Sequence, residues 1–213
     1  MKKTYKYCCC FMLLLMSFLL LMSGARRKEE ALAQTLAPEV LRFHVLANSD
    51  VPEDQALKLA VKDYLLEQLR PYVTSKAEAQ DYIMKHRGEL EEQTEEFIRS
   101  LGFNYPAEIR LETCNFPGRT YGDMTFPAGI YDAVRVLIGD GAGKNFWCVL
   151  YPSLCYLDST YAVVPKESKD ALQAVIPEAD FHALLSARRQ KTEQDSLLPR
   201  ITVRFKLFDW LAF

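Results

Sequence analysis

Histidine, cysteine and acidic side chains are the residues of this chain whose types could support acid–base, nucleophilic or metal chemistry. His44 is followed closely by Asp50, and such a pair can act as a general base or contribute to a metal site. No HxH, HExxH or Cys-x-x-Cys spacing occurs, and the other two histidines, His86 and His182, lie far away. Metal ligands would therefore come from distant positions. The competing interpretation of His44 is a strand residue whose ring hydrogen-bonds into the turn that follows.

The glycine-rich segment at residues 138–145, IGDGAGKN, suggests phosphate binding. A Walker A loop requires two glycines separated by four residues, followed by Lys and then Ser or Thr. Here Ile138 occupies the first glycine position, Asn145 follows Lys144, and a strand-like run comes next instead of a helix. We therefore interpret the segment as a hairpin turn between two strands. No G-x-S-x-G elbow for a nucleophilic serine is present either.

Periodicity defines the elements that would position these side chains. Residues 41–47 alternate largely between apolar and polar side chains, which predicts a strand ending at a polar corner. Asp50 and Glu53 fit a capping box for the helix that follows this corner, and Ser75 with Glu78 fits a second one. Apolar residues then recur at helical spacing after both boxes, which predicts two consecutive amphipathic helices.

The rest of the chain returns to a period of two and then to helical patterns. The fold class that this order predicts is α+β, with a mostly antiparallel sheet and helices packed on one face. The predicted strands lie at residues 107–113, 130–138, 146–151 and 201–207, and the predicted helices at 168–176 and 178–188.

Residues 1–25 are predicted to form a helical signal peptide or membrane anchor. Three lysines precede an apolar run at residues 8–22, and small residues follow it, as in export signals. As a helix the run would cover about 22 Å, less than the ~30 Å hydrocarbon core of a bilayer, but its flanks could extend it. We expect a linker at residues 26–39 and a single α+β signalling domain at residues 40–213.

The charge balance argues against nucleic-acid binding. The chain has 26 basic and 28 acidic residues, and three of the basic residues lie in the N-terminal segment. The remainder is therefore acidic, whereas nucleic-acid-binding domains carry clustered positive charge. No motif for a cofactor is present, so none is predicted.

The cysteines suggest one disulfide. Residues 8–10 are cysteines inside the apolar segment, which leaves Cys114, Cys148 and Cys155. Cys148 lies on a predicted strand, and the Pro-containing stretch after it can reverse the chain so that Cys155 returns opposite. An oxidising compartment favours a disulfide between these two residues, with two free thiols as the alternative.

Exposed aromatic and charged side chains in a rigid loop are typical of contact surfaces. Residues 116–129 are rich in Pro and Gly, so this segment should be a loop with at most a short strand. We predict a partner-binding surface made of Arg119, Tyr121 and Asp123 from this loop, together with Trp147. Most other aromatic residues in the middle of the chain are expected to be core.

Three segments resemble the stage II sporulation protein R family of spore-forming Firmicutes. They are RFHVLANSDVPEDQALKLAVKD at residues 42–63, RTYGDMTFPAGIYDAVRVLIGDGAGKNFWCVLYPSLCYLD at 119–158, and VRFKLFDW at 203–210. Phe146 stands where a second Trp is common in the family, and Ser153 where Pro is common. The family's cysteine pair corresponds to Cys148 and Cys155.

The resemblance implies a protein that is made in the forespore and exported into the space between the forespore and mother-cell membranes. There, secreted or membrane-anchored, it would activate a membrane-embedded aspartic protease of the mother cell, which processes the sigma-E precursor. The family has no established catalytic residues, so the resemblance assigns none to this chain and implies that it is not an enzyme.

Two hypotheses of different kinds follow for the function. The first is an intercellular signal that binds the membrane protease through Arg119, Tyr121, Asp123 and Trp147. The second is an exported hydrolase that acts on cell-wall polymer and uses His44 with Asp50 or a bound metal. A tethered scaffold at the wall or membrane is a third, weaker hypothesis.

Overall fold

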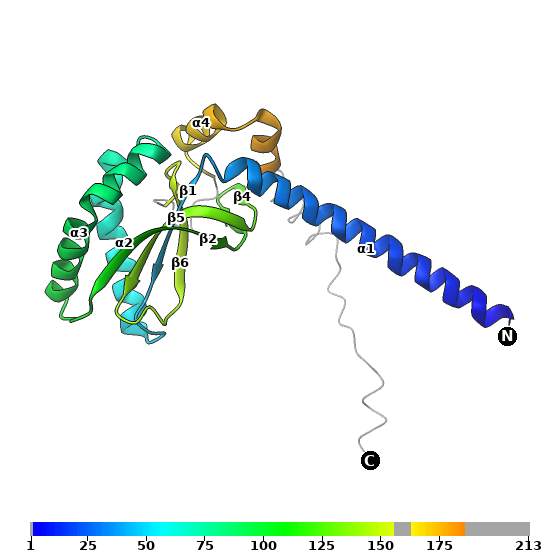
Figure 1. The fold of residues 1–213 in the computed structure, drawn as a ribbon, viewed down its shortest axis with the longest axis horizontal. Helices are drawn as coiled ribbons and strands as arrows, with labels where there is room; N and C mark the ends of the chain where they lie inside the picture. Colours follow the sequence, from blue (N-terminus) through cyan, green and yellow to red (C-terminus); the bar gives the residue numbers. More distant parts are fainter. Residues whose placement is uncertain (1, 156–162, 186–213) are drawn as a thin grey trace, which may run out of the picture.

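A four-stranded sheet forms the centre of the protein, with strand order β2-β5-β1-β6. The computed structural model describes residues 2–155 and 163–185 (Figure 1). Two further strands pair with each other as a separate hairpin. The strands are β1 (Leu41–Leu46), β2 (Ala107–Phe116), β3 (Arg119–Tyr121), β4 (Met124–Phe126), β5 (Gly129–Ile138) and β6 (Asn145–Tyr151).

The predicted α+β class is confirmed, and the sheet is rich in antiparallel pairs. Strand β1 is the exception, because it runs parallel to β5 and antiparallel to β6. The helices are α1 (Lys2–Leu36), α2 (Pro52–Leu69), α3 (Lys76–Ser100) and α4 (Lys166–Val175), with a short 3-10 turn at Arg70–Tyr72. Residues 178–185 are also helical. The predicted strand at 201–207 lies outside the described residues.

Helices α2 and α3 cover one face of the sheet (Figure 1). Alternation in β1 directs Phe43 and Val45 to this face, where both side chains are fully buried. They meet apolar side chains that recur along α2, such as Val61 and Leu65. Burying each side chain of this size contributes about 2 kcal/mol to folding, so this layer supplies much of the driving force.

A second layer covers part of the opposite face of the sheet. It contains the end of α1, the β3–β4 hairpin and α4, whose side chains form a separate apolar cluster. Leu36 of α1 and Phe126 of β4 are fully buried in this cluster, and Leu172 of α4 is nearly so. The sheet therefore has a helical layer on one face, as predicted, and a mixed layer on part of the other.

Helix α1 runs without interruption from Lys2 to Leu36. Its last turns lie at the sheet and the rest projects away (Figure 1). Most of the predicted linker, residues 26–39, is thus helical, and Ala33 is buried with Leu36. The predicted boundaries of the signal peptide or anchor (residues 1–25) and of the signalling domain (residues 40–213) remain predictions. Within the described part of the chain, no helix combines the length and apolarity needed to cross a bilayer.

The prediction of a hairpin between the third and fourth long strands is wrong. Strands β5 and β6 are not neighbours, because β1 lies between them. The glycine-rich segment must therefore cross the end of β1. Gly143 N donates to the Ala47 carbonyl at 2.9 Å, and a Cβ at position 143 would overlap the Ser49 carbonyl group. Glycine is needed here because two backbone segments approach so closely.

The polar corner after β1 holds this crossing loop. Asp50 Oδ1 accepts a hydrogen bond from Lys144 N at 2.7 Å, and Asn48 Oδ1 accepts one from Asp140 N at 3.0 Å. The predicted capping box of Asp50 and Glu53 is therefore wrong: Val51 is the N-cap of α2, and no side chain caps this helix. Asp50 is instead used by a distant loop, which sequence spacing alone does not reveal.

The corner is closed by a buried carboxylate that the sequence did not single out. Asp54 Oδ2 accepts hydrogen bonds from Ser49 Oγ at 2.6 Å and Asn48 Nδ2 at 2.9 Å. These two bonds lower the pKa of the Asp54 carboxyl. At the start of α3, by contrast, Ser75 Oγ accepts from Glu78 N at 3.1 Å, as the capping prediction requires.

Replacing Asp54 with Ala should lower the free energy of unfolding by about 2 kcal/mol, because Asn48 and Ser49 lose a charged acceptor in a buried corner. Urea denaturation at pH 7 measures this difference. The matched control is Asp63→Ala on the same helix, whose side chain is 70% exposed. That variant should stay within about 0.5 kcal/mol of the wild type. Equal effects at both positions would contradict the role given to Asp54.

Candidate functional site

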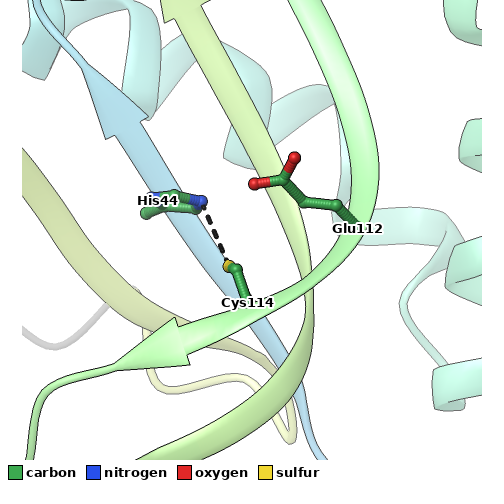
Figure 2. Close-up of side chains that lie close together, drawn as sticks. All are labelled: His44, Glu112 and Cys114. Atoms are coloured by element: carbon green, nitrogen blue, oxygen red, sulfur yellow. Dashed lines mark hydrogen bonds between the residues drawn. The ribbon is translucent and has the colours of Figure 1, made fainter.

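The second face of the sheet carries a group of polar side chains from β1, β2 and β5. Arg42 and His44 of β1 point to this face, opposite Phe43 and Val45. Ala133 of β5 pairs with Arg42 on one side and Glu112 on the other. Because the alanine side chain is small, side chains of β2 can reach across β5 toward β1. Figure 2 shows His44, Glu112 and Cys114 meeting in this way.

The three side chains are close enough to interact directly. His44 Nε2 lies 3.9 Å from Cys114 Sγ. A ring nitrogen, the sulfur and a carboxylate oxygen of Glu112 all lie within 4.8 Å of one another. The His44 ring stacks on Trp147, with ring centroids 4.9 Å apart, and meets the edge of Phe116 at 5.2 Å. The imidazole is therefore held on two sides.

Electrostatics keep His44 and Cys114 uncharged. Burial and the nearby Arg135 guanidinium lower the pKa of His44 to about 4, and burial raises the pKa of the Cys114 thiol. Glu112 pairs with Arg135, whose Nη1 lies 3.1 Å from Oε1. At neutral pH the pair is thus a thiol and a neutral imidazole. Cysteine catalysis requires the thiolate, so this arrangement does not suit a nucleophile.

Arg42 is a buried cation beside this cluster. Its side chain is fully buried, and no carboxylate pairs with it in the described part of the chain. Burial lowers the pKa of its guanidinium, and Nη2 reaches the Tyr121 hydroxyl at 3.5 Å. Four aromatic rings lie between 4.6 and 6.0 Å from its Cζ: Phe116, Tyr131, Phe126 and Tyr121. Their negative ring faces compensate part of the lost hydration.

Sequence reasoning did not find this polar group. Alternation placed Glu112 and Arg42 on the polar sides of their strands, and Leu46 indicated that the polar side of residues 41–47 is partly covered. One signal was available, since Cys114 occupies the same face as Glu112, and cysteine is usually buried. The convergence itself depends on the register of three strands, which spacing along the chain does not give.

Three of the predicted contact residues meet at a groove. Arg119 and Tyr121 of β3 and Trp147 of β6 line a groove of about 780 Å³, together with Lys62 of α2. Tyr121 is half-buried, and its hydroxyl donates to the Trp147 carbonyl at 3.3 Å. Arg119 is exposed on the rim. The structure therefore brings together side chains from two separate segments of the sequence.

The disulfide forms part of the same groove. Cys148 and Cys155, the favoured pair, are bonded with their Cα atoms 5.2 Å apart, and both line the groove. The bond fixes the chain that leaves β6 against the end of that strand. Cys114 is a free thiol.

Asp123 does not line the groove. Its Oδ1 accepts from Val164 N at 2.9 Å, and its Oδ2 pairs with Lys169 Nζ at 2.6 Å. It therefore fastens α4 to the β3–β4 hairpin and serves the fold. His44 and Asp50 are not brought together either, because Asp50 holds the Lys144 backbone while His44 lies among Cys114 and aromatic rings.

Comparison with known proteins gives a consistent match. The family model described as stage II sporulation protein R matches residues 37–161. Stage II sporulation protein R of Bacillus subtilis strain 168 is 32% identical over 180 residues, which cover 82% of this chain and 80% of the relative. No solved structure gives a significant match. The region matched by the family model contains the whole sheet, the cluster of His44, Glu112 and Cys114, and the residues that line the groove.

Protonation of His44 should destabilise the fold in acid. The folded-state pKa of about 4 lies below the ordinary value of about 6.5. The neutral ring therefore contributes stability above pH 6.5, and this contribution is lost as the pH falls toward 4. Between pH 7 and 4.5 the wild type should lose about 2–3 kcal/mol more stability than His44→Gln.

Urea denaturation in the presence of a chelator measures this difference, and the carboxylates common to both proteins cancel. His86→Gln is the matched control, because His86 lies half-exposed on α3. It should follow the wild type at every pH. If the stabilities of His44→Gln and the wild type change in parallel with pH, the lowered pKa assigned to His44 is refuted.

Proposed function

Because this chain belongs to the stage II sporulation protein R family, we propose that it is an exported signal that activates a membrane-embedded aspartic protease of the mother cell. Activation would lead to processing of the sigma-E precursor. A role in sporulation follows from the family itself. The protease, the precursor and the space between the two membranes as the place of action are the proposal.

The N-terminal segment and the disulfide support export. Lysines followed by an apolar run and small residues are the pattern of an export signal. A disulfide between Cys148 and Cys155 is stable in an oxidising compartment and uncommon in the cytosol. Both features fit a protein that works outside the cell that makes it.

The groove formed by Arg119, Tyr121 and Trp147 is the observation that carries the proposal. A signal needs only to bind, since a ligand shifts a receptor by its preference for the active state. Aromatic and arginine side chains in a pocket are the usual centres of such interfaces. Arg119 is exposed and makes no ion pair within the described residues, so it is available to an acidic group of the partner.

The two edges of the sheet differ in a way that also favours this groove. At β2 the outward amides of Ala107 and Ile109 donate to Glu95 and Glu91 of α3, at 3.1 and 2.8 Å. These carboxylates close the first part of the β2 edge to another strand. At β6, among the described strands, none pairs on the outer side. Part of this edge is already used, because the Trp147 carbonyl accepts from the Tyr121 hydroxyl and the Val149 carbonyl accepts from Leu154 N. The groove lies along β6, so an extended segment of the protease could add main-chain hydrogen bonds at the remaining backbone groups.

No observation favours the hydrolase hypothesis in the form that used His44 with Asp50. The two residues serve different parts of the fold, as described above. The neutral thiol and imidazole at the His44 cluster also lack the charge state of an activated nucleophile.

Arg119→Ala should weaken protease activation about tenfold, because the partner loses an arginine with which an acidic group could pair, while the exposed position leaves the fold intact. Cells that produce this protein, the protease and the sigma-E precursor provide the measurement, scored as the fraction of precursor cleaved. Arg110→Ala is the matched control, since Arg110 is an exposed arginine on β2 that pairs with Glu108. It should process normally.

Trp147→Ala tests the same groove from β6, with the secreted level measured to detect misfolding. Tyr121→Phe removes the hydroxyl contacts to the Trp147 carbonyl and to Arg42 Nη2 while keeping the ring beside Arg42. Normal processing by both Arg119→Ala and Trp147→Ala would exclude this groove as the contact surface.

A further inference from the structure

His44, Glu112 and Cys114 offer three different ligand atoms to one point in space (Figure 2). They come from β1 and β2, which are not neighbours in the sheet. We propose that these three side chains bind one Zn²⁺ ion. The proposal is independent of the docking function, because it rests on a different set of residues.

The ligand set matches the coordination chemistry of zinc. Zn²⁺ accepts imidazole nitrogen, thiolate sulfur and carboxylate oxygen at about 2.0–2.3 Å. Ligand atoms around a tetrahedral ion are therefore about 3.3–3.8 Å apart. The three atoms here lie within 4.8 Å of one another. Rotation of the flexible Glu112 side chain can supply the remaining movement.

His44 is already oriented for coordination through Nε2. The ring stacks on Trp147, and Nε2 faces the Cys114 sulfur. On the other side, Asn145 lies beside the ring. His44 Nδ1 and Asn145 Oδ1 are both buried, and neither has a hydrogen-bond partner in the described structure. A proton on Nδ1 directed at this oxygen leaves the Nε2 lone pair free, which is how supporting residues orient zinc-binding histidines.

Glu112 is held by its partner and remains accessible. Arg135 Nη1 bonds to Oε1 of the carboxylate at 3.1 Å, which leaves Oε2 for the ion. The Glu112 and Arg135 side chains are 27% and 29% exposed, so the ion and a water molecule for the fourth position can enter from this side. The buried side of the site is formed by His44, Trp147 and Phe116.

Charge balance suits a divalent ion, and the ligand types separate Zn²⁺ from Mg²⁺, Ca²⁺ and Cu⁺. Binding requires the Cys114 thiol to release its proton to solvent, and the resulting thiolate and the Glu112 carboxylate together neutralise Zn²⁺. Arg42 and Arg135 stabilise the thiolate but repel the ion, so we expect a weaker site than one with four cysteines. Mg²⁺ and Ca²⁺ prefer oxygen ligands only, and Cu⁺ does not favour the carboxylate.

Bound zinc would join β1 to β2 across β5. An ion that binds only the folded state stabilises it by mass action. The ion would therefore fix the side of the sheet that the second layer leaves partly open, close to Trp147 at the groove.

The experiment uses the untagged full chain in which Cys8, Cys9 and Cys10 are replaced by serine, so that Cys114 is the remaining free thiol. The chelator-treated protein is titrated with Co²⁺ as a spectroscopic probe. We expect one ion per chain, a thiolate-to-cobalt absorption band in the near ultraviolet, and displacement of Co²⁺ by Zn²⁺. Cys114→Ser should lose the band, and Glu112→Gln should weaken binding at least tenfold.

Matched controls separate this site from surface ligands. His86→Gln removes a half-exposed histidine, and Glu108→Gln removes a carboxylate that pairs with Arg110 much as Glu112 pairs with Arg135. Both should bind as the parent chain does. Asn145→Ala should lower the zinc affinity about 10–100-fold with one ion still bound. Circular dichroism establishes that each variant is folded.

Two results would overturn the proposal. One is a parent chain that takes up no Co²⁺ or Zn²⁺ at stoichiometric concentrations. The other is uptake that is unchanged in Cys114→Ser and Glu112→Gln, which would place the ion elsewhere. Glu112 is partly exposed, so its variant keeps the test decisive even if substitution of Cys114 impairs folding.

Discussion

The buried guanidinium of Arg42 is the constraint around which the second face of the sheet is organised. Removing a cation from water costs several kcal/mol unless other groups compensate for the lost hydration. Here the compensation comes from aromatic rings of β2, β3, β4 and β5, because the described residues provide no carboxylate partner. The short β3–β4 hairpin is thereby fixed against the sheet by Tyr121 and Phe126. One central side chain thus determines where a peripheral hairpin, and with it one wall of the groove, is placed.

Trp147 contacts both the cluster of His44, Glu112 and Cys114 and the groove. Its ring stacks on His44, its carbonyl accepts from Tyr121, and it lines the groove beside Arg119. The neutral state of His44 therefore matters beyond the cluster, since a charged, hydrated ring could not keep the same stacked position in a buried site. The groove and the His44 cluster differ in chemistry, but the Trp147 side chain contacts both.

Most local signals were read correctly from the sequence, the Asp50–Glu53 capping box being an exception, and features that depend on strand order were not. Alternation located the long strands, and the Ser75 cap of α3 follows from spacing within one turn. The hairpin prediction failed because β1, far away in the sequence, inserts between β5 and β6. Asp50 was assigned to the nearest helix for the same reason, although its partner is Lys144. The cluster of His44, Glu112 and Cys114 required the register of β1, β5 and β2 together, and burial of Arg42 required the hairpin as well.

The crossing loop at Gly143 has a consequence for how the chain assembles. Strand β1 lies between β5 and β6, so His44 has Arg135 on one side and Trp147 on the other. During synthesis the first strand of the sheet therefore emerges long before either neighbour exists. Contacts of such large sequence separation slow folding, because a long loop must close before the pairing is gained. Until β5 has been made β1 has neither of its partners, and its place in the sheet is complete only after residue 151. Any process that moves this chain through a membrane before that point therefore handles an incomplete sheet.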